Sequence, residues 1–253
     1  MCGRFSLFAP SDTVESRFDA GFAFDFEPTY NAAPGQELPV VTDATPGTIR
    51  ALEWGLVPSW ADDRSDFEFI NARAESIDEK PSFADAYERG HRSGERGEGD
   101  PDTPTAGRCL VPADGFYEWV ASESGTQPYR VALEDDGLFA MAGLWERWTP
   151  PSTQTGLSEF GTDSGPSTDP DPVETFTVVT TEPNEVVAGL HDRMAVVLSP
   201  DEEATWLGGD ADEVAGLLDP YPADRMRAYP VSTAVNDPAN DSPALVEEVD
   251  VEA

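Results

Sequence analysis

Basic residues are scarce in this chain, and histidine and cysteine are scarcer still. Among 253 residues there are 15 Lys and Arg against 50 Asp and Glu, for a formal net charge of −35, and Lys80 is the single lysine. This excludes a broad basic surface of the kind that grips nucleic acid through its phosphates. The acid is spread along the whole chain and is not gathered in one tail. We interpret it as halophilic adaptation to molar salt, where the Debye length falls to about 3 Å.

The few cysteines and histidines exclude several other classes of protein. Cys2 and Cys109 are too few for a disulfide scaffold, and the two histidines stand far from them, without metal-ligand spacing. We therefore expect no metal and no cofactor. No apolar run approaches the roughly 18–20 residues that cross a bilayer, and the N-terminus has no signal-peptide pattern. A cytoplasmic protein without membrane segments is the prediction, and we expect a monomer.

The spacing of apolar residues and turns predicts the fold class. Helices are expected over 11–20, 82–90, 183–191, 199–209 and 210–219, and strands over 38–43, 48–58, 107–120, 174–183 and 194–200. Residues 128–148 read as a hairpin around Asp136-Gly137. Strands without regular strand–helix alternation predict an α+β domain with a twisted, mainly antiparallel, barrel-like sheet and flanking short helices. Residues 1–253 form this single domain, with acidic, Gly/Pro/Ser/Thr-rich flexible insertions at about 89–107 and 149–174.

Cys2 has an unusual place in the chain, directly behind the initiator methionine. A small second residue permits removal of Met1, after which Cys2 carries a free α-amine beside its thiol. Ordinary pKa values of about 8 and about 8.5 let both groups react near neutrality. Together they suit an aldehyde, since the amine forms an imine and the thiol then closes a five-membered thiazolidine ring. The alternative is an inert thiol or a retained Met1.

Glu118 and His191 are candidates for proton transfer. Glu118 lies in "GFYEW", where aromatic neighbours would disfavour its charged form and raise its pKa toward neutrality. His191 follows a predicted helix and precedes a strand, and histidine is the usual proton shuttle at neutral pH. The alternatives are an outward-facing glutamate and a capping or packed histidine. His91 lies in the first insertion and reads as a solvated loop residue.

Two further segments carry candidate binding residues. Asn71 and Arg73, in "INARAES", would orient a polar substrate or a phosphate, because the arginine fork suits phosphate. Trp54 and Trp60, in "EWGLVPSW", would offer stacking faces to nucleic-acid bases, with core packing as the alternative. Cys109 reads as a small buried apolar residue.

The order of these segments resembles the SRAP (SOS response-associated peptidase) family, whose members are abasic-site processing proteins that crosslink to DNA. The resemblance rests on "MCGRF", "YNAAPG", "WGLVPSW", "INARAE", "RCLVPADGFYEW", "FAMAGLWE", "TFTVVTTEPN", "HDRMAVVL" and "VNDPANDSPALVEEV", and it covers residues 2 to about 249 outside the insertions. It implies a single α+β domain with a barrel-like sheet. It also implies single-stranded DNA with an abasic site as partner, and a thiazolidine between the mature N-terminal cysteine and the ring-opened aldehyde.

The resemblance also implies a role for each matching residue. Cys2 would be the nucleophile, Asn71 would position it, Glu118 would help open the sugar ring, and His191 would be the acid–base partner. Phosphate and DNA-path contacts would come from Arg4, Asn31, Trp54, Trp60, Arg73 and Arg193. The family associates AP-lyase activity and N-terminal self-processing with the fold. Its members commonly have Pro after "HDRM", where this chain has Ala195, which alters backbone stiffness beside His191.

Three rival readings stay open. An N-terminal-nucleophile amidotransferase also begins Met-Cys-Gly, but its glutamine-binding motifs are absent from this sequence. A thiol peptidase would use Cys2, His191 and Glu118 against other proteins. A non-covalent single-stranded DNA binding module would work without the thiol.

Overall fold

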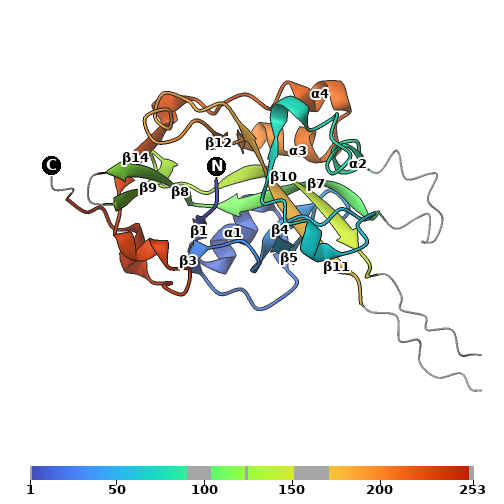
Figure 1. Cartoon of the computed structure of the whole chain (residues 1–253), viewed down its shortest axis with the longest axis horizontal. Coiled ribbons are helices and arrows are strands. Elements are labelled where there is room, and N and C mark those ends of the chain that lie inside the picture. The colour runs from blue at the N-terminus through green and yellow to red at the C-terminus, as the bar shows by residue number, and fades with distance from the viewer. Residues whose placement is uncertain (1, 90–103, 123–124, 151–170, 251–253) are drawn as a thin grey trace, which may run out of the picture.

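The computed structural model describes residues 2–89, 104–122, 125–150 and 171–250 (Figure 1). Most of both predicted insertions, with His91, lies outside these residues. The described ends of the insertions lead into strands, at Ala106 and Val173. No helix in the described part of the chain is long and apolar enough to cross a membrane.

Five strands close into a barrel. They are β4 (Glu37–Thr42), β5 (Thr48–Trp54), β7 (Ala106–Ala113), β10 (Phe139–Trp148) and β11 (Val173–Thr181), in the order β11-β10-β7-β4-β5. Neighbours are antiparallel, except that β11 runs parallel to β5, with Phe176 opposite Trp54, and so closes the ring. The barrel-like, mainly antiparallel sheet expected from the sequence is confirmed.

Short strands extend the barrel edges. β6 (Asn71–Arg73) and β12 (Met194–Ala195) pair with β11, β13 (Val197–Leu198) pairs with β10, and β2 (Gly21–Phe22) pairs with β5. Inward-facing side chains of the barrel strands, including Trp54, Trp145 and Phe176, form one apolar cluster that also contains Cys2. Because alternate residues of a strand face opposite sides, the other face forms a second cluster under the helices.

A second antiparallel sheet carries the N-terminus. Its order is β14 (Met226–Pro230), β9 (Gly125–Leu133), β8 (Gly115–Ser122), β1 (Phe5–Leu7) and β3 (Thr29–Ala32). Asp114 is the one residue between β7 and β8, so the strand predicted over 107–120 is divided between the two sheets. The buried Asp114 carboxylate accepts hydrogen bonds from the Ser6 hydroxyl (2.6 Å), the Phe8 N–H (2.6 Å) and Arg130 (3.0 Å). These bonds fix β1 at the junction.

Helices cover one side of the barrel: α2 and α3 pack against β7 and β10, and α4 packs against α3 (Figure 1). Four of the five expected helices are present, as α1 (Ser11–Phe18), α2 (Ala84–Tyr87), α3 (Pro200–Gly208) and α4 (Ala211–Ala215). An acidic N-cap residue stabilises the start of α4, because the Asp210 carboxylate accepts the Glu213 N–H at 3.0 Å. Short 3-10 turns cover 64–66, 74–76, 223–225, 233–236 and 243–246.

Two predictions of local structure are wrong. The segment over 183–191 forms successive turns and not a helix. The chain does turn here, over residues 133–136, where the Asp136 N–H donates to the Leu133 carbonyl at 3.1 Å and Asp136 has φ 54°, but the strands that flank the turn do not pair. β9 joins β8 and β14, whereas β10 joins β7 and β11. The hairpin signal therefore marks a change of sheet.

Candidate active site around Cys2

Cys2 lies just ahead of β1 and is fully buried in the apolar cluster of the barrel. Its backbone carbonyl accepts a hydrogen bond from Asn71 Nδ2 at 2.9 Å, and its Sγ lies 3.9 Å from the carbonyl of Arg4. Burial raises the pKa of the Cys2 thiol well above its usual range, and the charge of Glu118 raises it further. The resting group is therefore a neutral thiol, which needs a base before it can attack.

Glu118 lies on β8, next to the start of β1. Phe5 pairs with Phe116, and the Tyr117 N–H donates to the Arg4 carbonyl at 3.0 Å. Because alternate residues share a face, Glu118 points to the same side as Phe116, which packs in the cluster with Cys2. The side chain is 1% exposed, and burial raises its pKa to about 7. It can therefore both give and take a proton near neutrality.

The cause of the raised Glu118 pKa differs from the one expected. Tyr117 and Trp119, its neighbours in sequence, point to the opposite face of β8, where they pack with Val231, Val235 and Leu245. The buried cluster around Cys2 desolvates the carboxyl group instead. The predicted direction of the shift was right, but of the three aromatic neighbours only Phe116 shares the buried face of Glu118, and the rest of the cluster comes from other strands.

Asn71 joins β6 to the N-terminal segment. Its Nδ2 donates to the carbonyls of Cys2 and Ile70, at 2.9 and 2.6 Å. Its Oδ1 is buried and has no hydrogen-bond partner among the described residues. Buried amide oxygens are nearly always paired, so this oxygen is an unused acceptor on the side chain that contacts Cys2.

His191 ends the run of turns that replaces the predicted helix. Its N–H donates to the Val187 carbonyl at 2.9 Å, and Val187 and Leu190 pack against the cluster that holds Cys2. Nδ1 accepts the Arg193 N–H at 3.0 Å and also lies 2.9 Å from the exposed Asp192 carboxylate. Burial lowers the His191 pKa, so we assign the neutral ring, with its proton on Nε2.

Sequence reasoning gave no role to Asn184, which builds this run of turns. Its Oδ1 accepts the N–H groups of Val186 (3.1 Å) and Val187 (3.0 Å), and its Nδ2 donates to the Tyr221 carbonyl at 2.8 Å. An asparagine side chain that bonds to backbone two and three residues on is a known turn device. The "PNEV" pattern held that signal, but we read it as a helix start.

The predicted phosphate-binding arginines differ in their surroundings. Arg193 forms a two-pronged ion pair with Glu75 and donates to the Thr180 carbonyl at 2.6 Å, so its fork is occupied. Arg73 is exposed on β6, on the same face as Asn71. Of the two, Arg73 is the cation that a phosphate near Asn71 reaches without breaking an ion pair.

The two tryptophans are also unlike each other. Trp54 is 1% exposed, donates to the Ile70 carbonyl at 2.9 Å and packs on Phe5 and Phe176 inside the barrel. It presents no face to a base in this structure. Trp60 is half-buried, with its ring centroid 5.1 Å from that of Phe67, and its Nε1 donates to the Pro81 carbonyl at 3.3 Å. Cys109 is fully buried, as predicted.

Arg4 and Asn31 hold the segment 233–240 against the second sheet. Arg4 donates to Asn31 Oδ1 at 2.8 Å and to the Val235 carbonyl at 2.9 Å. Asn31 Nδ2 lies within 3.2 Å of three carbonyl oxygens in that segment, those of Val235, Asp237 and Asn240. Both residues were predicted to contact DNA, and the structure gives them these partners within the protein.

Asn31→Ala is expected to lower the free energy of unfolding by about 1–3 kcal/mol, because it leaves buried groups without partners. Hydrogen exchange of residues 233–240 should accelerate. Asn236→Ala is the matched control, since its exposed side chain accepts one bond, from Trp119, and it should cost less. Equal exchange in both variants would show that Asn31 does not hold the segment.

The described residues contain no group of three or more His, Cys, Asp or Glu side chains that could hold a metal ion. Cys2, Asn71 and Glu118 are brought together by direct contact and charge, and His191 is tied to the same cluster through its turn. The arrangement provides a thiol, a carboxyl group whose pKa is raised to about 7, an imidazole and an amide acceptor. It suits covalent chemistry on a small electrophile such as an aldehyde.

Comparison with known proteins gives the family by sequence and the fold by structure. The model of the family "SOS response associated peptidase (SRAP)" matches residues 1–93 and 102–238. The abasic site processing protein YoqW of Bacillus subtilis is 38% identical over 256 residues, which span 98% of this chain and 99% of that protein. The abasic site processing protein YoaM of the same organism is 39% identical, over 98% of each chain.

More distant relatives include a vertebrate protein and solved structures. The abasic site processing protein HMCES of Xenopus tropicalis is 27% identical, over 86% of this chain and 65% of its own length. A crystal structure of a protein from Bacteroides thetaiotaomicron matches 98% of this chain and all of that one, with a TM-score of 0.77 and 24% identity. That likeness establishes the fold.

Proposed function

Since this chain belongs to the SOS response associated peptidase (SRAP) family, we propose that it processes abasic sites in DNA by forming a covalent bond to them through Cys2. Its relatives YoqW and HMCES bear the name abasic site processing protein. The observation that carries the proposal is the placement of Cys2 at the chain start, held by Asn71 and close enough to Glu118 for that charge to raise the thiol pKa.

The covalent step joins an aldehyde to the mature N-terminus. Removal of Met1 leaves Cys2 with a free α-amine, which adds to the open-chain aldehyde of the abasic sugar. Loss of one water gives an imine. The thiol then adds its sulfur to the imine carbon, and its proton ends on the nitrogen. The product is a thiazolidine ring, and the net change is the release of one water molecule.

The surrounding residues supply the protons that these steps need. Glu118, with its pKa raised to about 7, gives a proton to the leaving hydroxyl and takes one from the thiol. The Oδ1 of Asn71 accepts from the attacking amine. His191 presents an Nε2–H to an oxygen of the sugar or its phosphate.

The DNA partner is proposed to be single-stranded. A net charge of −35 gives a duplex or a long strand little general attraction. Exposed Arg73, beside Asn71, is the proposed phosphate contact, and half-buried Trp60 is the proposed stacking surface. In this proposal the covalent bond supplies much of the stability of the protein–DNA complex, which other DNA-binding proteins obtain from a basic groove.

A crosslinking assay tests the proposal. Full-length protein is mixed in high KCl with a single-stranded oligonucleotide that carries one abasic site, and the products are separated on a denaturing gel. We expect a shifted band and, by intact mass, a protein that lacks Met1 and gains the oligonucleotide less one water. The matched control is the same oligonucleotide after borohydride has reduced its aldehyde to an alcohol. A band of equal yield with the reduced strand would rule out aldehyde chemistry.

A further inference from the structure

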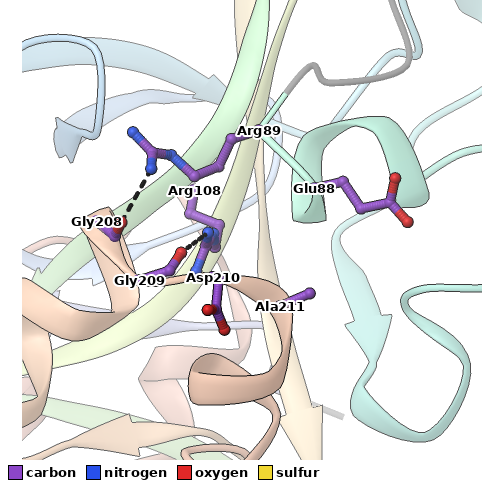
Figure 2. A pocket seen from close by; sticks show the side chains of 7 residues that line it. All are labelled: Glu88, Arg89, Arg108, Gly208, Gly209, Asp210 and Ala211. Atoms are coloured by element: carbon purple, nitrogen blue, oxygen red, sulfur yellow. Dashed lines mark hydrogen bonds between the residues drawn. The ribbon is translucent and has the colours of Figure 1, made fainter.

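A hollow of about 360 Å³ lies on the helical side of the barrel, apart from Cys2. Figure 2 shows Arg108 of β7 and Arg89, which follows α2, beside the end of α3 at Gly208 and Gly209. The side chain of Glu88 points away from both guanidinium groups (Figure 2). The hollow therefore has a wall made of two arginines in a protein with few basic residues.

Arg108 is buried without enough hydrogen-bond acceptors. It is 2% exposed, and its Nη2 donates to the Gly209 carbonyl at 2.6 Å. Its guanidinium carbon lies 5.6 Å from the ring centroid of Trp206. Its Nε and Nη1 are buried and have no hydrogen-bond partner in the described part of the chain. Buried charged donors are normally all paired, so two open donors call for an acceptor from outside.

Nearby carboxylates do not supply this acceptor. Asp43, 6% exposed, accepts from Arg89 Nε at 3.0 Å and from Trp145 Nε1 at 2.8 Å, so both of its oxygens are used. Asp210 Oδ1 accepts the Glu213 N–H at 3.0 Å ahead of α4. One buried carboxylate thus faces two guanidinium groups. Burial, and then the charge of Arg89, lower the Arg108 pKa to about 10, which still leaves it charged at neutral pH.

We propose that this hollow binds a phosphate group, with Arg108 and Arg89 as its cationic ligands. Guanidinium groups donate in pairs to phosphate oxygens, and a phosphate offers enough acceptors for the open Arg108 donors. The volume lies near the lower end of the roughly 300–1,000 Å³ of small-ligand sites, so it admits a phosphate with part of an attached group. The phosphate comes either from a free inorganic ion or from the end of a nucleic-acid strand.

Calorimetric titration of the full-length protein with inorganic phosphate, at fixed ionic strength set by KCl, tests the site. We expect one phosphate per chain. Arg89→Gln and Arg108→Gln should each weaken binding at least about tenfold, because each removes a charged donor. Arg227→Gln is the matched control, since that partly exposed arginine pairs with Asp136 outside the hollow, and the variant should bind phosphate as the parent does. Crosslinking through Cys2 should stay unchanged in all three.

Competition identifies the source of the phosphate. Two oligonucleotides of the same sequence are compared, one with a 5′-phosphate and one without. If only the phosphorylated strand displaces inorganic phosphate, the site binds strand ends. If neither strand competes, the site belongs to the free ion. Absence of phosphate binding, or equal weakening by Arg227→Gln, would overturn the proposal. If Arg108→Gln does not fold, the one-third-exposed Arg89 decides the matter through its own variant.

Discussion

Cys2→Ser is expected to abolish the crosslink that survives denaturation. The variant keeps the α-amine, so it still forms an imine with the abasic aldehyde. A hydroxyl is a far weaker nucleophile than a thiol and does not close a stable ring, so the imine hydrolyses. The band should vanish on a denaturing gel but return when borohydride is added to the reaction, because reduction traps the imine. Cys2→Ala should behave in the same way.

Cys109→Ala is the matched control for the loss of a thiol. Cys109 is also fully buried, but it lies inside the barrel on β7, opposite Gly143 of β10. We expect a full yield of the crosslink from this variant. A crosslink from Cys2→Ser that needs no reductant would remove Cys2 as the thiol donor. If the parent protein without Met1 gave no crosslink at all, the non-covalent DNA-binding module would be the better account.

Glu118→Gln is expected to slow crosslinking by about 10²-fold, because an amide neither gives nor takes a proton in this pH range. The parent rate should change with pH around 7, where the Glu118 carboxyl titrates. The variant should lose this dependence. Single-turnover rates between pH 5.5 and 8.5 measure both effects. A variant with the parent's rate and pH profile would show that Glu118 takes no part in the chemistry.

The same substitution should increase stability at high pH. The folded-state pKa of Glu118, about 7, lies above its ordinary value of 4.5, so the folded protein holds this proton more tightly than the unfolded chain does. That contribution is complete below about pH 4.5 and is lost as pH rises through 7. From pH 4 to 8, the free energy of unfolding of Glu118→Gln relative to the parent should therefore grow by about 3 kcal/mol, measured by urea denaturation. A constant difference would contradict the buried carboxyl assignment.

Local signals in the sequence predicted the elements that local physics decides. The caps Ser199 and Asp210, each followed by acidic residues in the first turn, predict α3 and α4 directly. Asp136-Gly137 predicts a turn but says nothing about which strands pair, because pairing depends on partners far along the chain. The turns over 183–191 escaped prediction since Asn184 bonds to the distant Tyr221 as well as to its own segment.

In the candidate site, too, local features of the sequence were predictable, but contacts with distant residues were not. Cys2 stood out by its position and Glu118 by its apolar neighbours, and both lie in the site. For the arginines, residue type predicted a capacity to bind phosphate but not the partner. Arg193 is 118 residues from the glutamate that it pairs with, and Arg4 is 231 residues from the Val235 carbonyl. Contacts at such separations are invisible in the local pattern.

The place of β1 in the second sheet determines when, during synthesis, the N-terminus can be buried. β1 lies between β3 and β8, and Arg4 is held by residues 235 and 236. A nascent chain therefore has no β8 to cover Cys2 until residues 115–122 have left the ribosome, and no final clasp until synthesis is almost complete. At rates of about 5–20 residues per second, Cys2 stays uncovered for seconds after it leaves the ribosome. The removal of Met1 that the proposed function requires therefore has time to occur before folding buries this segment.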